Sequence, residues 1–124
     1  MSDDNVHNIE FTGGDSFFGQ MKAGGVADQQ FIREIVQMFI EEGQLTLSLL
    51  GQGVLEKNIP NIRLYTHKLK SSFIMFDMIK EHELVTQLEK SETDNLKDSP
   101  ALFTELEISC KVNFTKLKKK YLDA

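Results

Sequence analysis

The sequence predicts an all-α fold: an antiparallel four-helix bundle with a short additional N-terminal helix. Apolar residues recur at three- and four-residue spacing along most of the chain, and no segment alternates with period two for long enough to form a strand. Only two of the 124 residues are proline, and the glycines fall before residue 54, so the second half contains few breaks to long helices. Long amphipathic helices joined by short connections typically pack as an antiparallel bundle.

The N-terminal part is expected to contain a tail and a short helix. Residues 1–12 are polar and irregular, which is typical of a flexible tail, and residues 13–124 would form one bundle domain. Asp15 is a suitable N-cap for a short helix that the Gly24-Gly25 pair would end. This helix would lie across one end of the bundle and carry Phe17, Phe18 and Met21.

The next helix is expected to begin after Asp28, a suitable N-cap, and to end at Gly51 and Gly53. Its residues facing the core would be those that recur at helical spacing: Phe31, Ile35, Met38, Phe39, Leu45 and Leu49.

Two further helices are expected between residues 58 and 90. The first would start near Asn58, with Pro60 tolerated in the first turn, and Asp77 would end it or cap the next one. The inward stripe of the first would be Ile62, Thr66, Leu69, Phe73 and Phe76. The apolar face of the second would be Met78, Val85 and Leu88, with Leu84 beside it.

The last helix is marked by Ser99-Pro100, which reads as an N-cap followed by proline at the first helical position. Its apolar stripe would be Leu102, Leu106, Cys110, Phe114, Leu117 and Tyr121.

Composition narrows the class of protein. A net charge of -5 argues against a nucleic-acid partner, and no spanning segment or signal peptide is visible, so we expect a monomeric cytoplasmic protein away from the membrane. The single cysteine, Cys110, rules out an intramolecular disulfide and fits a reducing compartment. No cofactor or metal is predicted, because His82 begins a zinc-protease-like pattern that lacks its second histidine.

The segment 65–72 carries the most informative chemistry. His67, Lys70 and Ser71 share one helix face, which places a nitrogen nucleophile beside a cation and a small side chain. The inward stripe of this helix leaves that face pointing outward, together with Leu64 and Ile74. A small-residue patch with an apolar rim is typical of a docking site, although a plain surface histidine beside a lysine fits the spacing too.

Glu89 is expected to lie near His67. If the two helices form a hairpin that turns at Asp77, both residues lie roughly 15 to 18 Å along the axis from the turn. A carboxylate that accepts a hydrogen bond from one imidazole nitrogen would fix the tautomer and leave the other nitrogen free to attack.

The run His67-Lys68-Leu69-Lys70-Ser71-Ser72 resembles the H-x-L-K-G-S motif of histidine-containing phosphotransfer (HPt) domains, and Leu88-Glu89 matches the second signature of that family. The resemblance covers residues 15–122 and is tightest over 62–90. It implies a four-helix bundle whose exposed histidine accepts a phosphoryl group from the aspartate of a response-regulator receiver domain and passes it to another receiver.

The resemblance also implies roles for particular residues. His67 would be the phosphoryl acceptor, Glu89 would orient it and Lys70 would stabilise the phosphoryl charge. The receivers, with a hybrid histidine kinase as one source of them, would bring the metal and acidic cluster that transfer needs. They would dock on Phe17, Phe18, Leu64, Ser71 and Ile74.

The sequence departs from the family pattern at three positions. Ser71 and Asp77 stand where the family has glycine, and Phe73 replaces a residue that is commonly small. None removes the nucleophile, although Ser71 crowds the approach to it. Two other functions remain open: an interaction module that binds receivers without carrying phosphate, and the substrate domain of a chemotaxis-type histidine kinase.

Overall fold

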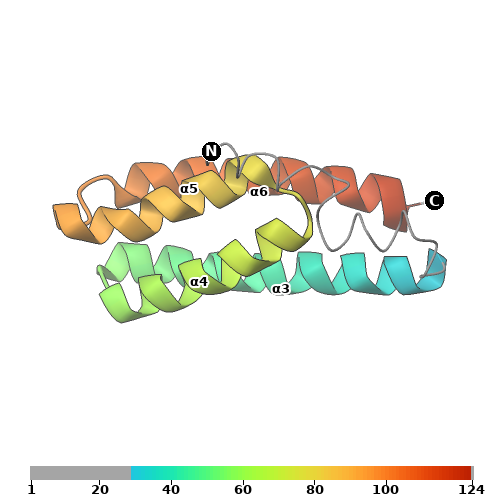
Figure 1. The fold of residues 1–124 in the computed structure, drawn as a ribbon, viewed down its shortest axis with the longest axis horizontal. Helices are drawn as coiled ribbons and strands as arrows, with labels where there is room; N and C mark the ends of the chain where they lie inside the picture. Colours follow the sequence, from blue (N-terminus) through green and yellow to red (C-terminus); the bar gives the residue numbers. More distant parts are fainter. Residues whose placement is uncertain (1–28, 124) are drawn as a thin grey trace, which may run out of the picture.

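The computed structural model describes residues 29–123, and within this range it contains four α-helices and no strand, as the sequence predicts. The predicted tail and the short helix with Phe17 and Phe18 lie outside the described residues. The helices, shown in Figure 1, are α3 (Gln29–Glu56), α4 (Ile59–Met75), α5 (Ile79–Lys90) and α6 (Ser99–Leu117), with a 3₁₀ helix η1 (Ser91–Asp94) before α6 and a π-helical turn η2 (Lys118–Leu122) after it.

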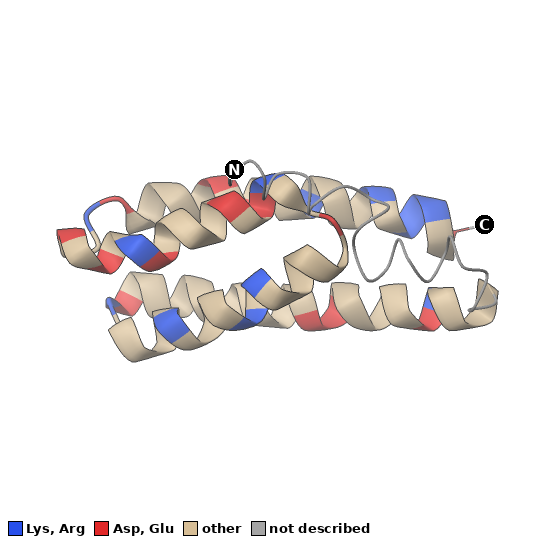
Figure 2. Cartoon of the chain, viewed as in Figure 1, with Lys and Arg blue, Asp and Glu red and all other residues tan. Residues whose placement is uncertain are grey.

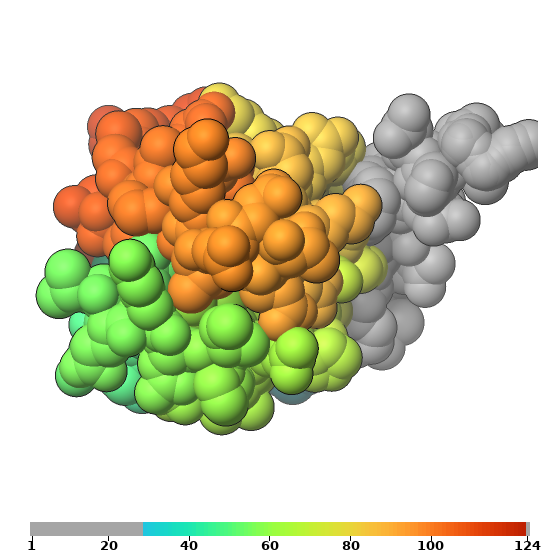
Figure 3. All heavy atoms as spheres, turned by 90° about the vertical axis from the view of Figure 1, so that its left-hand side faces the viewer, coloured from blue at the N-terminus to red at the C-terminus, as the bar shows by residue number. Residues whose placement is uncertain are grey.

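The helices run alternately up and down, and each packs against its neighbours in the chain, while α6 returns to pack against α3 (Figure 1). The α3–α4 connection lies at the same end of the bundle as residues 91–98, and Figure 3 shows this end closed by their side chains. α3 and α6 continue past the α4–α5 turn, where η2 also packs against α3. The result is the predicted antiparallel bundle, with two long and two short helices.

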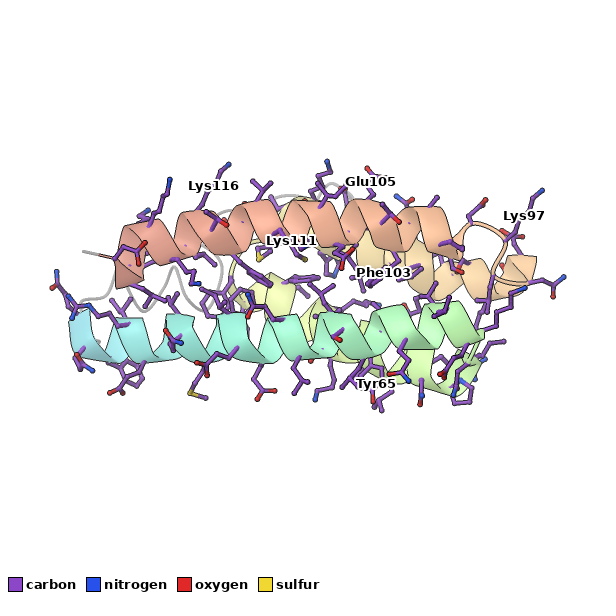
Figure 4. The ribbon with its side chains drawn as sticks, turned by 180° about the vertical axis from the view of Figure 1, so that it is seen from behind. Tyr65, Lys97, Phe103, Glu105, Lys111 and Lys116 are labelled. Carbon is purple, nitrogen blue, oxygen red and sulfur yellow. The ribbon has the colours of Figure 1, made fainter. Side chains whose placement is uncertain are left out.

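The predicted end of α3 at Gly51 and Gly53 is wrong, because both glycines lie inside the helix. A Cβ atom at Gly51 would approach the Phe103 ring to 2.7 Å, and Figure 4 shows Phe103 projecting from α6 toward α3. A Cβ atom at Gly43 would similarly lie 2.8 Å from the Phe114 ring. These glycines therefore give room for aromatic rings, and the helix instead ends before Lys57, whose φ of 55° is left-handed.

The predicted inward face of α3 also needs correction. Of the six predicted residues only Phe39 is buried; Ile35 and Leu49 are partly buried, while Phe31, Met38 and Leu45 are exposed. The helix carries a second apolar stripe, and α4 and α6 pack on that one. Its buried apolar residues are Val36, Phe39, Ile40, Leu47, Leu50 and Val54.

The boundaries and inward face of α4 agree with the sequence. The side chain of Asn58 accepts a hydrogen bond from the backbone N–H of Asn61 at 3.1 Å, and Pro60 lies in the first turn. The predicted stripe is buried from Ile62 to Phe73, whereas Phe76 is only partly buried. Phe76 stacks on Phe39 with ring centroids 3.9 Å apart, so it closes the end of the core beside α3.

The turn between α4 and α5 places Asp77 at a φ of 63°, a left-handed conformation that suits the glycine of the family pattern better than aspartate. Asp77 thus ends α4, while Met78 is the N-cap residue of α5 and has no side-chain capping bond. All four predicted core residues of this segment are buried: Met78, Leu84, Val85 and Leu88.

α6 begins at Ser99 rather than after it, and the Ser99 hydroxyl donates to the carbonyl of Leu96 at 2.9 Å. Burial raises the pKa of the Cys110 thiol, and the nearby Glu81 raises it further, so this cysteine belongs to the core. The predicted stripe is buried at Leu106, Cys110 and Phe114 and partly buried at Leu102, Leu117 and Tyr121.

The bundle contains a buried carboxylate and a cluster of lysines near its C-terminal end. The carboxylate of Glu81 is buried between α5 and α6, where Ser109 Oγ and Asn113 Nδ2 donate hydrogen bonds to it. The basic residues that follow Phe114 give the blue band at the end of α6 in Figure 2: Lys116, Lys118, Lys119 and Lys120. None of the helices within residues 29–123 has the length and apolar character needed to cross a membrane.

Candidate functional site

His67 lies in the middle of α4 and its side chain is exposed, as the helical pattern predicts. Its neighbour Thr66 faces inward, is fully buried and donates its hydroxyl to the carbonyl of Ile62 at 2.7 Å. Leu69 and Phe73 are buried on the same inward stripe. The core therefore fixes the rotation of α4 and with it the outward direction of the imidazole.

Lys70 and Glu89 form an ion pair across the α4–α5 interface. Lys70 Nζ lies 2.9 Å from Glu89 Oε1, and the two side chains are 30% and 32% exposed. The hairpin thus brings Glu89 level with the predicted site on α4. Among the contacts of the described residues, however, no hydrogen bond joins Glu89 to His67.

The partner of Glu89 has a physical explanation. Lys70 lies one turn beyond His67 on the same face, and its long side chain reaches the carboxylate. A charged donor forms a stronger hydrogen bond with a carboxylate than a neutral imidazole N–H does. The sequence predicts that Glu89 accepts a hydrogen bond from His67, whereas in the structure Glu89 accepts one from Lys70. The orienting role of Glu89 toward His67 stays a prediction.

A second ion pair, which the sequence did not indicate, lies on the other side of His67. Arg63, four residues before His67, binds Glu92 of η1 through Nη2–Oε1 and Nε–Oε1 contacts of 2.7 and 2.9 Å. This hydrogen bond and the charge of Glu92 raise the pKa of Arg63. In the sequence, the four-residue spacing between Arg63 and His67 indicates that the two residues share a helix face, but it does not indicate the partner of Arg63. His67 is therefore flanked along α4 by two cations, each paired with a carboxylate.

His82 on α5 is affected by the charge of Lys70. It is partly buried on α5, and this burial lowers the pKa of its imidazole, with a further decrease from the positive charge of Lys70. His82 is thus a second imidazole whose electrostatic environment includes Lys70.

The predicted docking residues within the described range are exposed: Leu64 is 52% and Ile74 is 40% accessible, and Ser71 is exposed between them. Phe17 and Phe18 lie outside this range. Beside this face, a groove of about 280 Å³ lies between α3 and the end of α4. Its lining is mainly apolar and includes residues that the sequence had assigned to the core or left unassigned: Ile35, Met38, Phe39, Glu42, Ser72, Met75 and Phe76.

Within residues 29–123, no group of three or more histidine, cysteine, aspartate or glutamate side chains is arranged to hold a metal ion. What the described site offers is a nucleophile, two neighbouring cations and an open, partly apolar surface around them. This arrangement can receive a small anionic group at the imidazole without displacing core side chains.

Comparison with known proteins identifies a family. A family model described as the Hpt domain matches residues 34–112, more than half of the chain, and this range includes His67, Lys70 and Glu89. Neither the curated proteins nor the solved structures contain a match to the chain.

Proposed function

Because the chain belongs to the Hpt domain family, we propose that His67 accepts a phosphoryl group from the aspartate of a response-regulator receiver domain and passes it to another receiver. Membership of the family itself implies a phosphotransfer role in two-component signalling, as a phosphocarrier that interacts with receivers rather than as a classical enzyme. The observation that best supports the residue assignment is the exposure of His67 at the centre of α4, above a buried stripe.

The proposed step is a displacement at phosphorus. The lone pair of one imidazole nitrogen attacks the phosphorus of the receiver's aspartyl phosphate, the P–O bond to the aspartate breaks, and its electron pair leaves with the carboxylate. An N–P bond forms, and the other ring nitrogen keeps its proton. The reverse displacement, by the aspartate of the accepting receiver, restores the free imidazole.

The cations on α4 support this step, because negative charge is distributed over the phosphoryl oxygens during transfer. Lys70 is the closer along the helix, three residues from His67, and Arg63 is four residues away on the other side. The metal ion and the acidic cluster that phosphoryl transfer also uses are proposed to belong to the receiver. A hybrid kinase as a source of receivers, a monomeric state and a cytoplasmic location stay predictions.

A transfer assay tests the proposal directly. The protein should become labelled when it is incubated with a panel of phosphorylated receiver domains, and the label should be acid-labile and alkali-stable, as a phosphoramidate is. An alkali-labile label would indicate an acyl phosphate instead. Receivers that bind the protein but never label it would favour a non-catalytic interaction module.

Lys70→Ala is expected to shorten the lifetime of the phosphohistidine or to slow transfer about fivefold to tenfold. The reason is that a partly exposed charge contact contributes roughly 1 kcal/mol or slightly more. Binding of unphosphorylated receiver should change little. Lys68→Ala is the matched control, because Lys68 is exposed on the same helix but points to another side. Equal effects of the two substitutions would contradict a specific role for Lys70.

Ser71→Gln is expected to block transfer by crowding the approach to His67, while His67 itself stays intact.

The apolar rim should instead control docking, so Leu64→Ala and Ile74→Ala should each weaken the binding of unphosphorylated receiver, measured by calorimetry. Leu55→Ala is the control, because Leu55 is an exposed leucine outside this face, on α3. If Ser71→Gln left both binding and transfer unchanged, the receiver would have to approach over another face.

A further inference from the structure

Lys70, the cation that would stabilise a phosphoryl group on His67, is already bound to the carboxylate of Glu89. Lys70 Nζ is 2.9 Å from Glu89 Oε1, and about two thirds of each side chain is covered by the bundle. Building on the proposed phosphorylation of His67, we propose that Glu89 competes with the phosphoryl group for Lys70 and thereby shortens the lifetime of the phosphohistidine. Glu89 would be a positioning residue that acts through Lys70, and it would favour release of the phosphoryl group over storage.

Charge explains why the two anions compete. Lys70 carries a single positive charge, whereas a phosphoryl group carries about −1.5 to −2 at neutral pH and Glu89 adds another negative charge. The ammonium group has three donors on a flexible stem, so it can turn from one anion to the other. It cannot neutralise both, and any contact that it keeps with Glu89 weakens its attraction for the phosphoryl oxygens.

The two ion pairs beside His67 differ in a way that selects Lys70 as the exchangeable cation. Arg63 holds Glu92 with two nitrogen atoms, and its Nε also lies 3.2 Å from Oε2. Such a forked contact fixes the guanidinium in one geometry. Lys70 binds Glu89 through a single contact, to Oε1. Of the two cations, Lys70 is therefore the one that can leave its carboxylate more easily.

His82 is not expected to take over the role of Lys70 as the cation beside the phosphoryl group. On α5, His82 is the second titratable group within its electrostatic reach, and partial burial together with the charge of Lys70 lowers the pKa of that imidazole. Both effects disfavour the protonated, cationic form of His82. Of the side chains of α5, Glu89 is the one that binds Lys70.

The test uses the full chain, phosphorylated chemically with potassium phosphoramidate, so that no receiver is needed. Hydrolysis is followed by ³¹P NMR at pH 7.5. The phosphorus signal of His67 is identified as the one that His67→Gln lacks, and its half-life is measured. Glu89→Gln keeps the shape and removes the charge, and it should lengthen this half-life about twofold to fivefold, which is the range expected for a partly exposed ion pair. Glu105→Gln, which removes an exposed carboxylate of α6 that is not paired with a cation of α4, should leave the half-life unchanged.

The double variant Lys70→Ala/Glu89→Gln separates the possible causes. If Glu89 acts through Lys70, its substitution should have no effect once Lys70 is absent, and the double variant should hydrolyse as fast as Lys70→Ala alone. An equal lengthening in both backgrounds would mean direct repulsion and would overturn the competition. A shorter or unchanged half-life in the single variant Glu89→Gln would also overturn it, and slower acceptance of the phosphoryl group would favour the orienting role predicted from the sequence.

The proposed phosphocarrier function and the proposed competition for Lys70 can fail separately. If no receiver phosphorylates the protein but Glu89→Gln lengthens the life of the chemically formed phosphohistidine, the proposed function fails and the competition stands. If receivers label His67 but the half-life is the same with and without Glu89, the competition fails and the phosphocarrier stands.

Discussion

His67→Gln is expected to abolish labelling by phosphorylated receivers without unfolding the bundle. Glutamine has no nucleophilic ring nitrogen, so the N–P bond cannot form. The imidazole is exposed, and substitutions at such positions seldom change the free energy of unfolding by more than about 0.5 kcal/mol. Labelling and thermal melting should be measured on the same preparation, with complete loss of the first and no change in the second.

His82→Gln is the control for this result, because His82 is the other histidine within residues 29–123 and lies within the electrostatic reach of Lys70. That variant should still be labelled. Label that persisted in His67→Gln would move the acceptor role to His82 or His7, and the assignment of the site to the centre of α4 would have to be abandoned.

Phe73→Ala is expected to lower the free energy of unfolding by about 3–5 kcal/mol. The ring is completely buried on the inward stripe of α4, and truncation would remove its apolar contacts and leave a cavity that the surrounding helices fill only in part. Domains of this kind have a total stability of roughly 5–15 kcal/mol, so the loss should be a large fraction of it. Urea denaturation followed by circular dichroism measures the change.

Leu55→Ala gives the matched comparison for Phe73→Ala, because Leu55 is 83% exposed at the end of α3 and should tolerate truncation within about 0.5 kcal/mol. A loss below about 1 kcal/mol for Phe73→Ala would show that the core can collapse around the smaller side chain. The bulky residue at this position would then be dispensable, and the small residue common in the family would serve equally well.

The sequence by itself determined α4 and therefore the direction of His67. The start of this helix has a strong local signal, an Asn58 side chain that caps the backbone followed by Pro60, and the structure contains both. The helix also has one dominant apolar stripe, so its rotation follows from the pattern alone. Phe73, unusual for the family, was expected to be absorbed by the core, and it is fully buried.

Only the tertiary structure decided the orientation and the end of α3. This helix has two apolar stripes, and local spacing does not indicate which of them the neighbouring helices will cover. Gly51 was read as a helix terminator because its local preference is to break helices, but the approach of Phe103 makes the absence of a side chain an advantage within the helix. The orientation of α3 depends on how α4 and α6 pack against it, and the space beside Gly51 depends on Phe103 of α6.

The partner of Glu89 was decided in the same way. The hairpin geometry that the sequence predicts brings this carboxylate to the level of the α4 site, where His67 and Lys70 both lie on the facing turns. The structure pairs it with Lys70 at 2.9 Å, because a charged ammonium on a long side chain is the stronger donor. Sequence pattern thus determines which residues share a helix face, whereas the choice among several possible partners across an interface depends on distances that only the packed helices fix.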